Sequence, residues 1–496
     1  MKYLIKISFM VFAAGLFTAC SEDYLEVTPS QTLTSEDINE AGQYNPAILD
    51  GYLVGLYNTM YTTGSGGTNL RHDDFGQKSW DIYYDMLGSD MVLAGNTYGW
   101  YSYIANYTAT EDYTSNSSYM PWRYYYRIIR GANTLIGGYD FDAIPEDAES
   151  RAKLGQGLSI RGYSYLNLMH LYVNDNTDLS SPAIPLMLEP TLDPLPISTT
   201  GEVYNQIISD LELAVELLEN GPRNNKRTIN KDVARGILGY AYAAIGRNAE
   251  AAAVTKAVID EGNFPLLTAE DLVYDMATGS GGGFNDVNTP AWMWGQDVTL
   301  EMGLDLVSWW GQVDQYTYSY TWAGDPKTID NSLYAEIPAN DVRKTQFVGL
   351  GQKKPTNKFF APDRVSGGQR SVVTDYIYMR IEEMYLLYAE TAAKSGAEGG
   401  EAGARQALRD IMEIRVPDAS YVDALSGQEL IDEILIQQRI EFWGEGKTYL
   451  LMKRNQETRT RGANHLFFAG ESFQYNDPRL TLDIPQAEVQ NNPNIN

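Results

Sequence analysis

Apolar residues recur at helical spacing over several long stretches of the chain, most clearly in residues 201–262. Thr199 and Glu202 precede this stretch at the spacing of a capping box, in which each side chain bonds the backbone amide of the other. The pattern predicts an amphipathic helix that ends at Asn220-Gly221-Pro222. Its apolar stripe consists of Val203, Ile207, Leu211, Val215 and Leu218.

Two segments have the pattern of paired helices that are joined by a glycine. The first turns at Gly246, and its small and aromatic residues have tetratricopeptide spacing. The second occupies residues 380–415 and turns at Ser395-Gly396. Further helices are predicted over 151–172 and after Ser426-x-x-Glu429, which has the form of a second cap. No 34-residue period is sustained, so the pattern does not predict a regular solenoid.

Two long insertions, at about 62–120 and 275–330, interrupt the helical pattern. They are rich in Gly, Asn, Ser, Asp, Tyr and Trp and lack helical periodicity. Long irregular insertions in compact proteins are usually functional loops, and this ring content argues against disorder. The sequence therefore predicts a mainly α fold, in which tetratricopeptide-like helix pairs form a scaffold and a loop-rich face carries a few short strands.

The first twenty residues have the layout of a bacterial export signal. Lys2 and Lys6 precede an apolar run over 7–19, which is short for a transmembrane span. The only cysteine, Cys20, follows Thr18 and Ala19 and is the candidate lipidation residue. An ordinary secretory peptide with an incidental cysteine is the alternative. We expect residues 1–19 to be a signal peptide and 20–496 to be one domain.

The composition excludes several classes of function. The chain has 496 residues with 65 acidic and 37 basic ones, a net charge of −28, which becomes −30 without residues 1–19. Such a charge disfavours nucleic-acid binding. One cysteine excludes an intramolecular disulfide framework and a cysteine-rich zinc site. The sequence predicts neither a cofactor nor a metal site.

Six segments, in the same order along the chain, resemble the SusD/RagB family of outer-membrane glycan-binding lipoproteins. Cys20 with the Tyr24-Leu25-Glu26 that follows resembles the family's N-terminus. The other five segments are WRYYYRIIRGAN (122–133), RGYSYLNLMHLY (161–172), MRIEEMYLLYAE (379–390), RIEFWGEGK (439–447) and the tail from Ile484-Pro485 to Asn492-Pro493-Asn494. Lys447 stands where the family more often has arginine.

This resemblance implies a single, mainly α, SusD-like fold whose loop-rich face holds the ligand site. It implies a lipid-anchored protein of the outer membrane that faces the cell exterior. It further implies that the protein captures an oligosaccharide or polysaccharide without catalysis and delivers it to a SusC-type TonB-dependent transporter. A peptide- or protein-binding role on the same scaffold, or a secreted glycoside hydrolase, are the alternatives.

Aromatic rings in the two insertions are the candidate ligand-binding residues. A flat ring presents apolar area that matches the C–H face of a sugar, and polar neighbours bond its hydroxyls. The first insertion contributes Trp100, with Tyr98 and the polar Asn96 as secondary candidates. The second contributes Trp309 and Trp310, which stand next to Gly311 in a predicted loop. Tyr316 is a further secondary candidate.

Other rings have a competing structural interpretation. Trp292 and Trp294 are predicted to lie in a core strand, and Trp122 and Trp443 in core helices. The rings from Tyr316 to Trp322 occur at every second position, so in an extended segment they would share one face. That face could bind a ligand or could be the buried face of a hairpin.

No motif of a nucleophilic, zinc-dependent or dinucleotide-dependent enzyme occurs in the chain. His170 lies on a core-like helix and is predicted to be structural. Glu382, Glu383 and Glu390 are expected in scaffold ion pairs. A glycosidase needs only two carboxylates about 5–10 Å apart, so among 65 acidic residues that alternative stays open.

Overall fold

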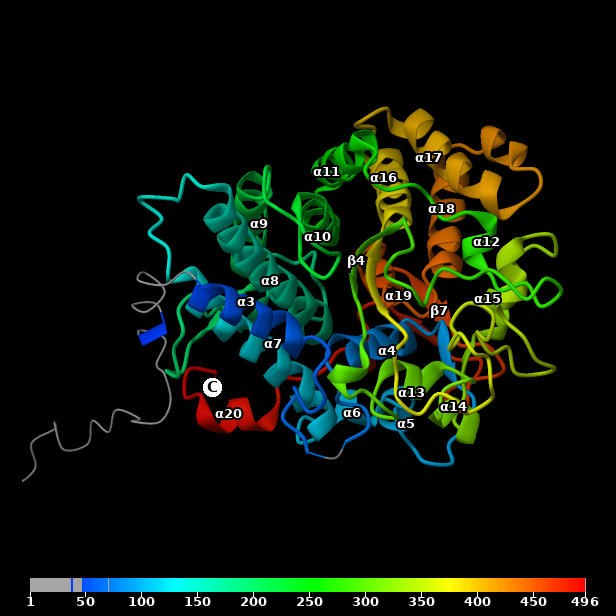
Figure 1. Cartoon of the computed structure of the whole chain (residues 1–496), viewed down its shortest axis with the longest axis horizontal. Coiled ribbons are helices and arrows are strands. Elements are labelled where there is room, and N and C mark those ends of the chain that lie inside the picture. Colours follow the sequence, from blue (N-terminus) through cyan, green and yellow to red (C-terminus); the bar gives the residue numbers. More distant parts are fainter. Residues whose placement is uncertain (1–36, 39–46, 70, 496) are drawn as a thin grey trace, which may run out of the picture.

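The computed structural model describes residues 37–38, 47–69 and 71–495, and it is rich in helix. The predicted signal peptide and Cys20 lie outside these residues. The long helices form a scaffold that runs through most of the molecule (Figure 1). They are α3 (Ala47–Thr59), α7 (Asn116–Ile136), α8 (Ala148–Tyr172), α9 (Thr200–Leu217), α10 (Lys231–Ala244), α11 (Asn248–Glu261), α16 (Ile381–Ser395), α17 (Gly400–Arg415) and α18 (Gly427–Glu441). The short helix α19 (Thr448–Arg454) packs against α18.

Helices α7 to α11 stack in chain order, and each packs against its neighbour in the series. Helix α11 also packs against α16. The two predicted helix pairs are confirmed as α10 with α11 and α16 with α17. Gly246 and Gly396 turn the chain between the partners at φ values of +77° and +74°, a region that favours glycine. A Cβ at Gly239 would stand 2.7 Å from Thr255 Cγ2, so this glycine allows α10 and α11 to approach closely.

One of the two predicted helix caps is present and the other is wrong. Thr199 Oγ1 accepts a hydrogen bond from Glu202 N at 3.2 Å, and Glu202 Oε2 accepts one from Thr199 N at 2.7 Å. Ser426 precedes α18, but its side chain makes no capping bond. The amide of Gly427 instead donates to Glu401 of α17 at 3.1 Å. A distant carboxylate therefore replaces the local cap.

The insertions contain more structure than the sequence predicts. Residues 62–120 include α4, in which all eleven residues are buried. The Gly-, Asn- and Ser-rich composition around this helix led us to treat the whole insertion as irregular. The shorter helices are α4 (Gln77–Leu87), α5 (Ser102–Ala105), α6 (Thr108–Glu111), α12 (Ala269–Leu272), α13 (Trp309–Val313), α14 (Tyr320–Ala323), α15 (Asn331–Glu336) and α20 (Gln486–Asn491).

The strands are short and form four antiparallel pairs among the described residues. The pair of β1 with β5 joins the two insertions, with Val92 opposite Thr328. Trp292 and Trp294 lie in β4 and are at most 1% exposed, as predicted, and Trp122 and Trp443 are also core residues. The strands are β1 (Met91–Leu93), β2 (Pro182–Pro185), β3 (Ile197–Thr199), β4 (Trp292–Gln296), β5 (Lys327–Ile329), β6 (Tyr376–Arg380), β7 (Thr458–Thr460) and β8 (Ser472–Gln474).

A buried ion cluster joins the segment that follows the second insertion to the C-terminal helices. Glu441 at the end of α18 accepts bonds from Arg343, Arg380 and Arg415 at 2.6–2.9 Å. These three arginines hold the pKa of Glu441 well below its usual range, against the opposing effect of burial. Glu445 bonds Arg380 and Lys358 at 2.8 Å. The RIEFWGEGK segment thus supplies two buried carboxylates to the core.

The predicted scaffold role of the glutamates on α16 is confirmed. Glu382 pairs with Arg380 at 3.0 Å, Glu383 with Lys447 at 3.2 Å, and Glu390 with Arg454 at 2.7 Å. All three carboxylates are buried. Lys447, the residue that departs from the family pattern, therefore still forms an ion pair here.

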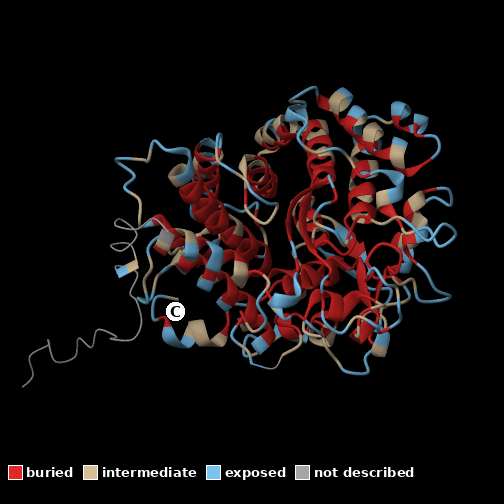
Figure 2. Cartoon of the chain, in the orientation of Figure 1, coloured by how far each residue is buried: buried red, intermediate tan, exposed pale blue. Residues whose placement is uncertain are grey.

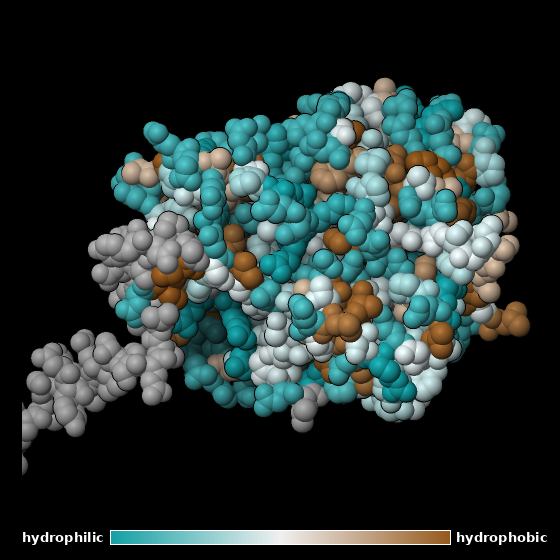
Figure 3. Space-filling view, viewed as in Figure 1, coloured by the Kyte–Doolittle hydropathy of each residue, from teal (hydrophilic) through white to brown (hydrophobic). Residues whose placement is uncertain are grey.

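Burial follows the scaffold, and the exposed residues are concentrated in connecting loops (Figure 2). On the face that Figure 3 shows, hydrophilic side chains predominate and apolar ones form small separate patches. Within the described residues no helix is both long and apolar enough to cross a membrane.

Candidate functional site

The two insertions meet at a group of aromatic rings around Trp100. His72 stacks on Trp100 with ring centroids 5.3 Å apart and planes 1° apart. Tyr320 packs edge-on against both rings, and its hydroxyl hydrogen-bonds His72 Nδ1 at 2.6 Å. Tyr98 packs edge-on against Tyr320 at 5.3 Å and is 58% exposed. Trp100 is half-buried, so it retains accessible ring surface. We call these four residues the Trp100 cluster.

The loop that carries Tyr98 and Trp100 is fastened by a buried carboxylate. Asp325 accepts hydrogen bonds from three successive backbone amides, those of Thr97, Tyr98 and Gly99, the latter two at 2.8 and 3.2 Å. The side chain of Asp325 is fully buried. Gly95 lies so close to residue 324 that a Cβ would come within 2.1 Å of its carbonyl oxygen. This loop is therefore held in place against the second insertion.

A buried polar pair supports the cluster from beneath. Gln312 donates from Nε2 to the carbonyl oxygen of His72 at 2.7 Å and accepts from Lys327 Nζ at 2.8 Å. Neither side chain is exposed, and burial lowers the pKa of Lys327 to about 7. These bonds fix the backbone of His72, and thus the ring that lies on Trp100.

A second ring group lies farther along the same insertion. Tyr318 packs at 5.4 Å from Trp322, and Arg370 stacks on Tyr318 with its Cζ 3.8 Å from the ring centroid. Trp322 is 43% exposed, and Arg370 is exposed as well. A Cβ at Gly367 would stand 2.7 Å from the Trp322 ring, so the backbone supports one side of the indole. We call these residues the Trp322 group.

Asp314 anchors the segment that joins these rings to the core. It is buried and accepts bonds from Tyr316 N at 3.0 Å, Thr317 Oγ1 at 2.8 Å and Ala361 N at 3.1 Å. Burial raises the pKa of its carboxyl group to about 6. Tyr316 is half-buried, with the guanidinium of Arg364 4.5 Å from its ring centroid. Its hydroxyl accepts a bond from Arg364 at 2.8 Å.

The structure corrects the prediction for Trp309 and Trp310. They form the first turn of α13 and are only 2% and 1% exposed, so neither can serve as a surface platform. Trp309 packs edge-on against Phe359 at 4.7 Å. Gly311 does not mark an open loop, because a Cβ there would come within 2.0 Å of the Leu306 carbonyl oxygen. The glycine permits close packing, and this buries both indoles.

The alternating run from Tyr316 to Trp322 does not form one face. Tyr320 is the first residue of α14 and is 6% exposed within the Trp100 cluster, whereas Trp322 is exposed. Tyr316 lies against Arg364 and Tyr318 against Arg370. The chain bends into a short helix after Ser319, so the extended interpretation with a shared face is wrong.

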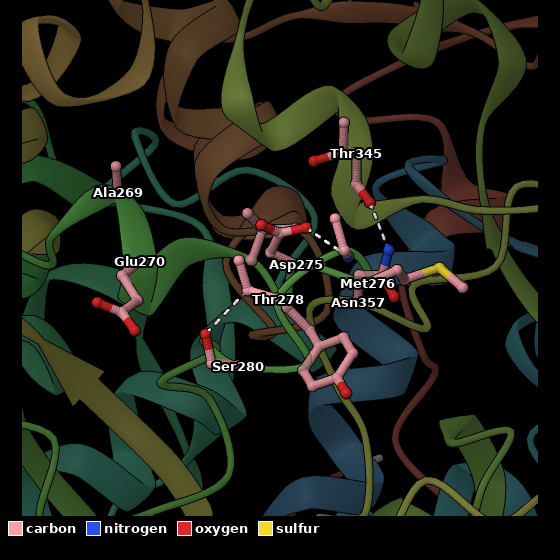
Figure 4. Close-up of a pocket in the computed structure, with 11 residues that line it drawn as sticks. Ala269, Glu270, Asp275, Met276, Thr278, Ser280, Thr345 and Asn357 are labelled. Atoms are coloured by element: carbon pink, nitrogen blue, oxygen red, sulfur yellow. Dashed lines mark hydrogen bonds between the residues drawn. The ribbon is translucent and has the colours of Figure 1, made fainter.

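A hollow of about 750 Å³ lies beside these residues (Figure 4). Its lining includes the carboxylates Glu270 and Asp275 and the exposed Met276. Tyr274 and Asn357 also line it, and both contact Arg364. The Tyr274 ring centroid is 3.8 Å from Arg364 Cζ, and Arg364 donates to Asn357 Oδ1 at 2.8 Å. No sequence signal indicated this hollow.

The sequence predicted three members of this surface and missed others. Asn96, Tyr98 and Trp100 lie together on one loop, of which Asn96 and Tyr98 are exposed. His72 was missed because a lone histidine carries no local pattern, and its partner Trp100 is distant in sequence. Arg370 could have been found from the excess of basic residues over 350–370.

His170 is buried with Nδ1 bonded to Leu166 O at 2.6 Å, which confirms its structural role.

Sequence comparison places both ends of the chain in one family. Residues 23–243 match a SusD-like family described as starch-binding and associating with the outer membrane, and residues 317–496 match the SusD family itself. Together these matches span most of the chain. The chain belongs to the SusD/RagB family. No curated protein is significantly similar to it in sequence.

Solved structures share the SusD fold with this chain. A SusD-like carbohydrate-binding protein from Bacteroides vulgatus superposes with a TM-score of 0.74 at 23% identity, covering 90% of this chain and 97% of its own. A SusD superfamily protein from Bacteroides thetaiotaomicron has a TM-score of 0.72 at 23% identity, with coverages of 90% and 98%. The surface glycan-binding protein A of Bacteroides uniformis has a TM-score of 0.64 at 16% identity, with coverages of 91% and 99%. The predicted mainly α, SusD-like fold is thus confirmed.

Proposed function

We propose that this protein is a non-catalytic, cell-surface glycan-binding lipoprotein of the outer membrane. It captures oligosaccharides on the surface formed by the Trp100 cluster and the Trp322 group. The observation that carries the proposal is the placement of partly exposed rings, Tyr98, Trp100 and Trp322, on loops that buried carboxylates hold in place. Such rings present apolar faces to sugars at low entropic cost because their positions are fixed before binding.

Family membership and the surface glycan-binding proteins among the structural relatives support this proposal. Affinity electrophoresis in gels that contain single polysaccharides tests it. We expect retardation of the wild type by at least one polysaccharide, and weaker retardation of Trp100→Ala and of Trp322→Ala. Unchanged mobility of both variants would refute the proposed surface. Binding of peptides but of no glycan on arrays would favour the alternative role in peptide recognition.

Delivery to a transporter and anchoring through lipid are the remaining parts of the proposal. The protein would release its ligand to a SusC-type TonB-dependent transporter while a lipid on Cys20 holds it at the membrane, as one SusD-like domain over residues 20–496. Mild detergent extraction followed by purification of the protein should recover such a transporter. Cys20→Ala should abolish incorporation of labelled fatty acid and release the protein from membranes. Sustained release of reducing sugar from a bound glycan would contradict the non-catalytic role.

A further inference from the structure

The segment that supplies Arg370 to the Trp322 group is basic, although the protein as a whole is acidic. Residues 350–370 contain five lysines or arginines and one acidic residue, whereas the whole chain has a net charge of −28. Four of the five form no ion pair with any residue that the structure describes. They are Lys353, Lys354, Arg364 and Arg370.

These four side chains have neutral partners only. Lys354 donates to Gln315 Oε1 at 2.9 Å, and Lys353 lies 4.9 Å from the centroid of the Tyr334 ring. Arg364 donates to Thr356 O and Asn357 Oδ1, both at 2.8 Å, and it stacks on tyrosine rings. Elsewhere in the fold, buried arginines such as Arg380 are matched by carboxylates. Arg223 and Arg461, however, also bond only carbonyl oxygens. What distinguishes Arg370 is its exposed position on the Tyr318 ring.

Carboxylates near the rings are already engaged inside the fold. Asp325 accepts three backbone amides, and Asp314 accepts bonds from its own segment and from Ala361. Asp73 is buried and holds Arg71 through two bonds at 2.9 and 2.5 Å. None of these three carboxylates forms an ion pair with Arg370.

Arg370 is the cation that is best placed to meet a ligand. It is exposed, and its guanidinium stacks on Tyr318, which in turn packs against the exposed Trp322. The backbone of the residues before it lies along Tyr316 and Tyr318, with Tyr318 N bonded to Gln369 O at 2.9 Å. Stacking limits the motion of the planar guanidinium and leaves its edge free for a bidentate bond to a carboxylate or sulfate.

We propose that the ligand of this surface is an acidic oligosaccharide that carries uronate or sulfate groups. Its sugar faces would stack on Trp322 and Trp100, while Arg370 bonds an anionic group. This inference rests on the proposed function, because it specifies the glycan class for the same surface. The acidic remainder of the protein would repel such a chain, so the unpaired cations direct it to this face.

An array of uronate-containing, sulfated and neutral oligosaccharides, probed with the mature full-length chain, tests the inference. We expect acidic chains to bind more tightly than neutral ones, and the binding to weaken as salt is raised. Arg370→Gln should lower the affinity for the strongest acidic binder roughly fivefold, as expected for a partly exposed ion pair. Arg370→Lys, which retains the charge, should recover part of that loss.

Arg247→Gln is the matched control. Arg247 also lies on a tyrosine ring, with its Cζ 4.4 Å from the Tyr242 centroid, but it belongs to the turn between α10 and α11. This variant should bind acidic chains like the wild type. Equal losses for Arg370→Gln and Arg247→Gln, or equal binding of neutral and acidic chains, would overturn the inference.

The two proposals fail in different ways. Binding to neutral chains that depends on Trp322 would leave the proposed function standing and overturn only the acidic specificity. Retention of no glycan at all would refute the proposed function, and the inference with it.

Discussion

Trp100 lies parallel to His72, with the two ring planes 1° apart. The imidazole covers part of one face of the indole, and Arg71 Cζ lies 5.8 Å from the indole centroid, so a ligand would meet the ring surface that these groups leave exposed. His72 is itself fixed by Tyr320 through its ring and by Gln312 through its backbone. The indole is therefore already oriented before any ligand arrives.

Replacement of Trp100 by alanine should weaken glycan binding and leave the fold intact. Trp100 is half-buried at the end of a loop, so its loss removes stacking area and creates no closed cavity. We expect an affinity loss of about tenfold, typical of a central aromatic contact. Calorimetric titration with a retained glycan measures the loss, and thermal unfolding checks the fold. A large drop in melting temperature would instead identify Trp100 as a structural residue.

Replacement of Trp310 by alanine should have the reverse effect. The indole is 1% exposed against Trp309, so its removal leaves a cavity. We expect the free energy of unfolding to fall by about 3–5 kcal/mol. Urea unfolding followed by circular dichroism measures this, at a temperature where the variant is still folded. If the variant were as stable as the wild type but no longer bound glycan, Trp310 would be a ligand-binding surface residue, which would contradict this prediction.

Asp325→Ala should release the loop that carries the rings. Three backbone amides would lose their common acceptor, so amides 97–99 should exchange hydrogen faster. Glycan affinity should fall as well, although Asp325 is buried away from any ligand. Hydrogen-exchange mass spectrometry of the peptide that contains these amides measures the release. Unchanged exchange there would show that β1 and β5 alone hold the loop.

Glu441→Gln should destabilise the protein strongly. The substitution leaves Arg343, Arg380 and Arg415 buried with one fewer carboxylate, and an uncompensated buried charge costs about 3–5 kcal/mol. Chemical unfolding provides the measurement. Glu429→Gln, at an exposed position in the first turn of the same helix, is the control and should change stability little. Equal stabilities of the two variants would contradict the importance of the cluster.

His170 should make stability depend on pH below neutrality. Burial lowers its pKa from 6.5 to about 3, so the folded ring stays neutral while the unfolded chain takes up a proton near pH 6.5. The unfolded state binds more protons between these values, and the free energy of unfolding therefore falls as the pH drops from 6.5 towards 3. Between pH 7 and pH 5 the free energy of unfolding of His170→Gln should therefore fall by about 2 kcal/mol less than that of the wild type. Parallel pH profiles in urea unfolding would contradict this role.

The sequence predicted the scaffold well because helical pairs leave local, periodic signals. The stripe after Thr199 and the turns at Gly246 and Gly396 depend on residues close in sequence. The site was predicted only in part, because its geometry depends on distant contacts. Trp309 and Trp100 both stand near a glycine, and only the packing around Gly311 and the bonds from Asp325 show which ring is buried. His72 joins Trp100 through a fold that no local pattern encodes.

The bond from Tyr98 to Asp325 joins residues 227 positions apart, and β1 pairs with β5 over a similar separation. Closing so long a loop is slow and contributes only when the intervening chain has folded. A partly folded chain therefore lacks the oriented rings of the Trp100 cluster. Only a completely folded molecule can bind ligand through these rings, so glycan binding would serve as an assay for complete folding of this protein.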